Sequence, residues 1–316
     1  MPGTRIIKTG LADLYDARIY KAWIQGYGEP EHEFEQFLRT QDTEVEDYRW
    51  SHISGFGLWP RKTLGANVST DTVYQGYDTT CTPATYARMF TVEEETVEDD
   101  RHSLLGEQLS SALAQAGRDT LETLAASMFN NADTTTYASP WVGTSANGDG
   151  LALLSTAHTI LSGGTYANTA SAAVDLSVAS LQAARTRLEK CQDARGRLWS
   201  LDAVTLIVPS DSRWLMSEIL DSPKMPYTAD NTPNVVREGL TGKVWKRLTD
   251  TDSWFLLAGK AGDAGQKGHM LTFLSRLAAQ FKRHNEFLSG DRQYRGRLRF
   301  GFCAPDFRGI DGSMGG

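Results

Sequence analysis

The chain has 316 residues, of which 40% are hydrophobic, and its formal net charge is −7. That hydrophobic share is enough for a globular core, and no apolar run approaches the ~20 residues that a membrane-spanning helix needs. The acidic balance, without a long basic tract, disfavours tight nonspecific binding to nucleic acid, which depends on Lys and Arg. The N-terminus lacks the apolar centre of a secretory signal, so we expect a soluble cytoplasmic protein.

The first fifty residues are rich in charged side chains. Residues 11–20 could form a short helix, which the turn sequence Gly26–Pro30 would end. Acids dominate residues 29–47, where Phe34 and Phe37 stand isolated. Such a segment has little means of forming its own core, so we expect an arm that lies across another surface.

A β pattern follows over residues 53–97. Thr, Val and Tyr are frequent, and the side chains from Tyr86 to Glu93 alternate with a period of two. Residues 65–76 have the composition of a polar tip between two strands. Because large apolar residues are few, the segment predicts a long hairpin and not a compact domain.

A long amphipathic helix is predicted from about Arg101 to Asn130. The acids Asp99 and Asp100 place negative charge where a helix start favours it, and 30 residues of helix would be roughly 45 Å long. Apolar residues recur every three or four positions along it. We expect them to form one buried stripe made of Leu105, Leu109, Leu113, Leu121 and Leu124.

The second half of the chain alternates between helix and strand signals, so the predicted class is mixed α and β. Helices are expected over residues 177–191 and after Pro209, the latter with Trp214, Leu215, Ile219 and Leu220 as its apolar residues. Strands are expected over residues 203–208, 254–258, 269–273 and 293–303.

No familiar catalytic motif occurs. Ser155 and His158 could join an Asp in a nucleophilic triad, but nothing nearby supplies the sharp turn or oxyanion donors that such a site needs. Residues 259–268 have Gly and Lys at the wrong spacing for a phosphate-binding loop, and Asn147–Gly150 lacks the further carboxylates of a calcium loop. The acids of residues 93–100 are typical of a solvated helix start. We predict no catalytic, cofactor-binding or metal site.

The three cysteines are widely spaced, at Cys81, Cys191 and Cys303. An odd and sparse count is unlike a disulfide framework and fits a reducing compartment. We interpret each cysteine as a small buried apolar residue.

Several short stretches occur in a recognisable order: Tyr74–Tyr77, Tyr86–Val92, Glu98–Asp100, Leu154–His158, Asp175–Ala184, Asp193–Arg197, Leu206–Pro209, Trp254–Ala258 and Tyr294–Gly301. Their order and spacing resemble the major capsid proteins of tailed bacteriophages, which have the Hong Kong 97 fold, and most closely the branch of Mu-like major head subunits. The similarity spans most of residues 74–301, while the first fifty residues match only in character.

The resemblance implies an α+β capsid fold in five parts. These are an N-terminal arm (1–52), an extended hairpin loop (53–97), a peripheral domain with a long spine helix (98–175), an axial domain (176–280), and a C-terminal strand returning to the peripheral domain (281–316).

The resemblance also implies a structural role: a major capsid protein, not an enzyme, which self-assembles as pentamers and hexamers into an icosahedral shell. The shell would enclose double-stranded DNA without sequence-specific binding, be assembled in the host cytoplasm and reside in the virion. We find no room for a cleaved N-terminal scaffolding segment, so a separate scaffolding protein is expected, with a portal and, as a further option, a decoration protein. Lys62 lies near the hairpin, but no partner for a covalent crosslink can be assigned to it.

Arms and hairpins without cores can bury apolar residues only against neighbouring subunits. The candidates for such contacts are Phe34, Phe37, Tyr74, Tyr77 and Phe90, with packing inside their own chain as an equal alternative. Two other functions stay open: an encapsulin-like compartment that holds a cargo enzyme, and a soluble hydrolase that uses Ser155 and His158.

Overall fold

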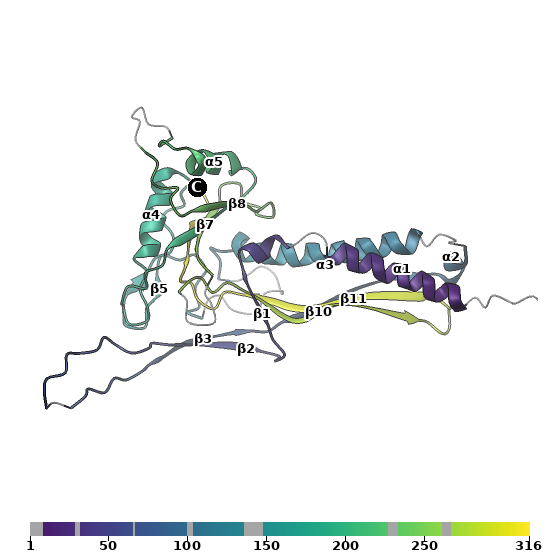
Figure 1. Cartoon of the computed structure of the whole chain (residues 1–316), viewed down its shortest axis with the longest axis horizontal. Helices are drawn as coiled ribbons and strands as arrows, with labels where there is room; N and C mark the ends of the chain where they lie inside the picture. Colours follow the sequence, from purple (N-terminus) through teal and green to yellow (C-terminus); the bar gives the residue numbers. More distant parts are fainter. Residues whose placement is uncertain are drawn as a thin grey trace, which may run out of the picture.

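Two four-stranded sheets and a projecting hairpin organise the described part of the chain (Figure 1). The computed structural model describes residues 9–28, 32–65, 67–99, 104–135, 148–226, 233–260 and 267–316. We name the two sheets by their length. The long sheet has the order β1-β10-β11-β4, and the short sheet, at one end of the molecule, has the order β12-β9-β7-β8.

The long sheet is built on a pair of antiparallel strands, β10 (Thr272–Asn285) and β11 (Arg292–Cys303). Strand β4 (Ala84–Val92) pairs antiparallel with β11, and β1 (Arg39–Asp42) pairs parallel with β10. Alternate residues of β11, among them Tyr294, Leu298 and Phe300, are buried. One face of this sheet is therefore apolar and needs a cover.

Two long helices cover that face (Figure 1). Helix α3 (Leu104–Asn130) follows the short helix α2 (Glu94–Asp99), and α1 (Thr9–Gly28) packs along α3. Trp23 of α1 reaches the sheet and stacks on Phe281 with ring centroids 5.0 Å apart. Its ring occupies the space that a side chain at Gly296 would fill. No helix in the described ranges is long and apolar enough to span a membrane.

The predicted stripe of α3 is correct at one end and wrong at the other. Leu121 and Leu124 are buried, but Leu105 is 43% exposed. The second half of α3 enters the main core, where Phe129 packs edge-on against Phe255 of the short sheet at 5.0 Å. Within the described ranges, the first half packs against α1, and Leu105 points away from that contact into solvent.

Several described residues among the first fifty lie in the core, which corrects the expectation of a coreless arm. After the 3-10 helix η1 (Glu33–Gln36), the chain adds β1 to the long sheet, and Phe34 and Phe37 are buried in the main core. Phe34 lies edge-on to Phe302 of β11 at 5.4 Å. These two aromatic residues are therefore not available for contacts between subunits.

The short sheet combines β7 (Ala203–Val208), β8 (Thr241–Val244), β9 (Trp254–Ala258) and the unpredicted β12 (Ile310–Ser313). Helices α4 (Val178–Glu189) and α5 (Arg213–Asp221) flank it, together with the small pair β5 (His158–Thr159) and β6 (Thr165–Tyr166). Ser177 and Ser180 close a capping box at the start of α4. Trp214, one of the apolar residues of the helix predicted after Pro209, is 75% exposed.

The hairpin consists of β2 (Tyr48–Ile53), β3 (Gln75–Cys81) and the loop of residues 54–74 between them, which we call the hairpin loop. It is shorter in sequence than the predicted 53–97, because β4 pairs in the long sheet. The predicted boundary between residues 280 and 281 falls inside a strand, because β10 pairs in the long sheet from Thr272 onward. The final strand, β12, pairs with β9 in the short sheet.

Two of the cysteines correct the sequence prediction. Cys81, at the end of β3, is bonded to Cys303, at the end of β11, with Cα atoms 6.2 Å apart. They are separated by 222 positions, so their spacing carried no local signal. Cys191 is free and buried, as expected.

Replacing Leu121 by Ala should lower the free energy of unfolding by roughly 2–5 kcal/mol, because lost transfer energy is added to the cost of a cavity. The same substitution at the half-exposed Leu105 should change it by less than about 0.5 kcal/mol. Denaturant unfolding of unassembled subunits measures both values. Equal losses at the two positions would contradict the observed burial.

Alkylation of the denatured protein without reductant should modify a single thiol, that of Cys191, because Cys81 and Cys303 are bonded. Prior reduction should expose all three thiols, and intact mass counts them. Cys191→Ser is the control and should abolish labelling in the absence of reductant. Three modified thiols before reduction would rule out the Cys81–Cys303 bond.

Candidate assembly interface

The hairpin loop carries a group of large apolar side chains that its own chain does not cover. In Figure 1 the hairpin projects from the body on the side of the long sheet away from α1 and α3. Trp59 is 94% exposed and Leu58 is 82% exposed; their exposed apolar neighbours are Ile53, Phe56, Leu64 and Val68. Contiguous exposed apolar residues mark interaction sites on soluble proteins.

The two hairpin strands, by contrast, are firmly anchored to the body. Tyr48 and Trp50 pack together over the Cys81–Cys303 pair, with ring centroids 4.4 Å apart. The carbonyl oxygen of Pro305 lies 3.0 Å from His52 Nε2 and accepts a hydrogen bond of 3.1 Å from the Thr79 hydroxyl. The hairpin therefore leaves the body in a defined direction.

A buried ionic pair lies under this anchor. Arg308 bonds Asp306 at 2.8 Å, and its guanidinium lies over the Trp199 ring, 5.0 Å from the centroid. Tyr77 donates a hydrogen bond of 3.4 Å to Asp306. Burial, and then the charge of Asp306, raise the pKa of Tyr77, so its hydroxyl stays a neutral donor. Each charge here has a partner, as buried charges require.

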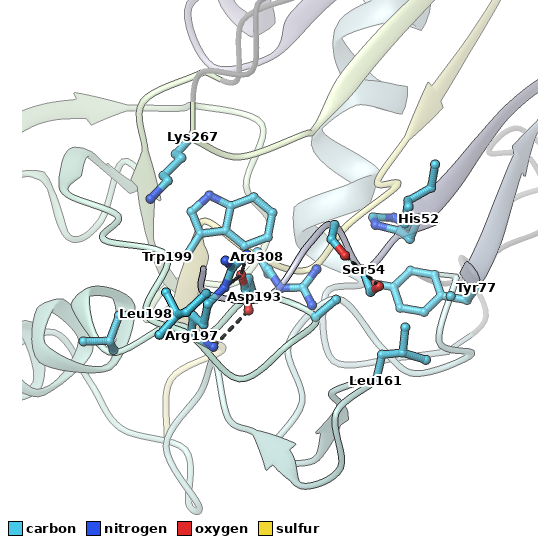
Figure 2. Close-up of a pocket in the computed structure, with 15 residues that line it drawn as sticks. His52, Ser54, Tyr77, Leu161, Asp193, Arg197, Leu198, Trp199, Lys267 and Arg308 are labelled. Atoms are coloured by element: carbon cyan, nitrogen blue, oxygen red, sulfur yellow. Dashed lines mark hydrogen bonds and ion pairs between the residues drawn. The ribbon is translucent and has the colours of Figure 1, made fainter. Parts of the chain in front are cut away.

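An open cleft separates the base of the hairpin from the turn that precedes Trp199 (Figure 2). Its volume is about 580 Å³, and apolar side chains such as Ile53, Leu161 and Leu198 line much of it. The acids beside it, Asp193 and Asp306, are already paired with arginines. The cleft thus extends the apolar surface of the hairpin and offers no free acid–base pair.

The five aromatic candidates have different surroundings. Phe34 and Phe37 are buried, as described above. Tyr77 and Phe90 are partly buried, and Phe90 stacks on Tyr294 at 5.1 Å. Tyr74, at the end of the hairpin loop, is 56% exposed and remains available to a neighbour.

The structure does not assemble the Ser155–His158 hydrolase site. His158 is buried, stacked on Phe307 at 4.0 Å, and its Nδ1 lies 2.6 Å from Asp149. Its Nε2, which would activate a nucleophile, has no hydrogen-bond partner among the described residues. Ser155 Oγ instead accepts from the Ala157 N–H at 3.3 Å. The pattern is that of a structural histidine with a carboxylate partner, which sequence reasoning missed because Asp149 looked like part of a turn.

The other candidates from the sequence are the metal-binding, phosphate-loop and crosslinking residues. No group of three metal-ligating side chains occurs within the described ranges. Asn147, Asp100 and residues 261–266 lie outside those ranges. The side chain of Lys260 donates to the backbone oxygen of Glu35, and Lys62 is exposed on the hairpin loop.

Several solved structures share the fold of this chain. The capsid of cyanophage P-SCSP1u matches with a TM-score of 0.55 at 9% identity, covering 89% of this chain and 87% of that chain. The capsid of Ralstonia phage GP4 matches with a TM-score of 0.53 at 10% identity, covering 87% of this chain and 86% of that chain. A structure from Microbacterium phage Oxtober96 matches with a TM-score of 0.51 at 15% identity, covering 90% of this chain and 92% of that chain. These likenesses confirm the predicted α+β fold of the Hong Kong 97 type.

Among curated proteins, no sequence matches at a significant level. The closer resemblance to the Mu-like branch stays a prediction. A family model described as phage capsid protein matches residues 76–310, which is more than half of the chain, and the chain therefore belongs to the phage capsid protein family.

Proposed function

We propose that this chain is the major head protein of a tailed bacteriophage and assembles as pentamers and hexamers into an icosahedral shell around double-stranded DNA. The observation that carries the proposal is the hairpin loop, whose apolar residues are exposed on an anchored projection. Family membership supports the same role. In these terms, the long sheet with α3 is the peripheral domain, the short sheet is the axial domain, and the hairpin is the extended loop between subunits.

The physical reason for assembly is the apolar surface of the loop. Each large side chain fully buried by a neighbour would gain about 1.5–3 kcal/mol of transfer free energy. Part of that gain is offset by the cost of ordering side chains and of bringing two subunits together. Because the loop is anchored at its base, less of its freedom remains to be lost on docking. A second copy of the same chain, repeated by symmetry, would supply the cover.

The proposed partners follow from the same role. The acidic subunit, with a net charge of −7, suits a container that must not hold its DNA by tight electrostatic contacts. A separate scaffolding protein and a portal are proposed partners, with assembly in the host cytoplasm and the finished shell in the virion. The role is structural, without catalysis.

Purified subunits should form shells at moderate concentration, visible by negative-stain microscopy and as fast-sedimenting particles. Deleting residues 58–69, which lie beyond the Gly57–Asp71 hydrogen bond, should leave the thermal midpoint nearly unchanged and abolish the shells. The double substitution Thr63→Ala and Ser69→Ala, in the same loop, is the control and should still assemble. A wild-type protein that stays monomeric under all conditions would overturn the proposal.

The contents of particles from infected cells distinguish a phage head from the remaining alternative, an encapsulin-like compartment. A phage head should contain double-stranded DNA that survives nuclease treatment of the outside. A particle that holds a single cargo enzyme and no nucleic acid would instead identify an encapsulin-like compartment.

A further inference from the structure

The turn Asp193–Arg197 at the edge of the cleft is built as a rigid support. The carboxylate of Asp193 accepts hydrogen bonds from the backbone N–H groups of Arg195 and Arg197, at 2.8 and 2.9 Å. The Asp193 N–H in turn donates to the Arg197 carbonyl at 2.7 Å. Gly196 sits at φ +75°, a conformation that favours glycine. These bonds fix the direction in which the Arg195 side chain leaves the turn.

Arg195 reaches across to both sides of the hairpin loop. In the part of the loop that follows β2, its guanidinium donates to the carbonyl of Gly55 at 2.9 Å. In the part of the loop that precedes β3, the guanidinium donates to the carbonyl of Thr72 and forms an ion pair with the carboxylate of Asp71 at 3.2 Å. It also lies over the ring of Tyr74, 5.6 Å from the centroid. One planar group with several donors thus ties two loop segments to the body.

Asp71 closes the loop at the same place. Its carboxylate accepts the N–H of Gly57 at 2.5 Å, and its other oxygen accepts the N–H of Thr72. The Gly57 bond first, and also Arg195, hold the pKa of Asp71 below its usual value although desolvation opposes them. The carboxylate is therefore charged at neutral pH and available to the arginine.

Arg195 acts on a different part of the hairpin from the other anchors. His52, Tyr77, Thr79 and the Cys81 disulfide all lie on β2 or β3 and hold the strands. Within the described residues, the hydrogen bonds that join residues 55–73 to the body come from Arg195. The loop is otherwise held by its own internal bonds and by the strands that carry it.

We propose that Arg195 is the positioning residue of the hairpin loop, a latch that sets the angle at which the loop meets a neighbouring subunit. The meeting with a neighbour rests on the proposed function, but the latch itself acts within one chain. Its acceptors are mostly backbone carbonyls at a partly exposed site, which water can solvate when the arginine leaves. Release therefore lets the loop pivot on β2 and β3 while the fold stays intact.

The test measures the loop in unassembled subunits. Spin labels on cysteines introduced by Val68→Cys, in the loop, and Glu189→Cys, at the end of α4, report the distance between loop and body. Wild-type subunits should give a narrow distance distribution. Arg195→Ala should broaden the distance distribution and shift its mean, while the thermal midpoint stays the same. Arg195→Lys should give a distribution of intermediate width, because an ammonium group cannot bridge all the acceptors. Arg49→Ala, which removes the arginine of the Arg49–Asp78 pair within the hairpin strands, is the matched control and should leave it narrow.

Assembly supplies the second measurement. Shells of Arg195→Ala should be lost or become heterogeneous in diameter, whereas Arg49→Ala shells should match the wild type. An unchanged distance distribution in Arg195→Ala overturns the latch, and so does equal broadening in Arg49→Ala. If Arg195→Ala fails to fold, Asp71→Asn, which weakens the ionic contact, must broaden the distribution for the proposal to stand. Wild-type subunits that never assemble but show a broadened loop in Arg195→Ala would retain the latch and remove the shell function.

Discussion

The segment from Cys303 to Arg308 connects the two sheets, and the placement of the hairpin depends on it. It leaves β11 of the long sheet and leads to β12 of the short sheet, and all of its residues are buried. Cys303 is bonded to Cys81, Pro305 accepts hydrogen bonds at its carbonyl, and Phe307 fills the core of the short sheet. One short stretch thus fixes the relative positions of both cores and of the projection between them.

Charged side chains are buried in and beside this connection, and each has a partner of opposite charge. Asp306 and Arg308 form a pair that is almost fully buried, and Arg187 of α4 bonds Asp311 of β12 through two hydrogen bonds of 2.6 and 2.9 Å. A buried pair contributes little net stability, because desolvating both charges costs about as much as their attraction returns. Removing one partner of either pair would leave an uncompensated buried charge, which is strongly destabilising.

Sequence patterns predicted the elements whose signal is local. The 3.6-residue period located α3 and α4, and short apolar runs located β7 and β9. The pattern could not show which elements share a core. Phe34 looked isolated because its partner Phe302 lies at the far end of the chain, and β4 looked like part of the hairpin because both are β-rich.

The candidate interface was predicted in outline and not in detail. The composition of residues 53–97 indicated a projection without a core, and several large apolar side chains of the hairpin loop are exposed. Its attachment rests on pairs that no spacing reveals, such as Cys81 with Cys303 and Arg195 with Asp71. Both pairs join residues more than a hundred positions apart, and only the completed fold brings them together.

The late position of β11 in the chain has a consequence for synthesis on the ribosome. Strand β4 is made early, yet its only strand partner among the described residues is β11, residues 292–303. At roughly 5–20 residues per second, β4 waits on the order of ten seconds or more for that partner, and β3 waits as long for Cys303. A nascent chain therefore cannot complete the anchor of its hairpin until nearly all of it has been translated. In an unfinished chain, the hairpin therefore lacks the contacts to Cys303 and Pro305 that orient it in the complete fold.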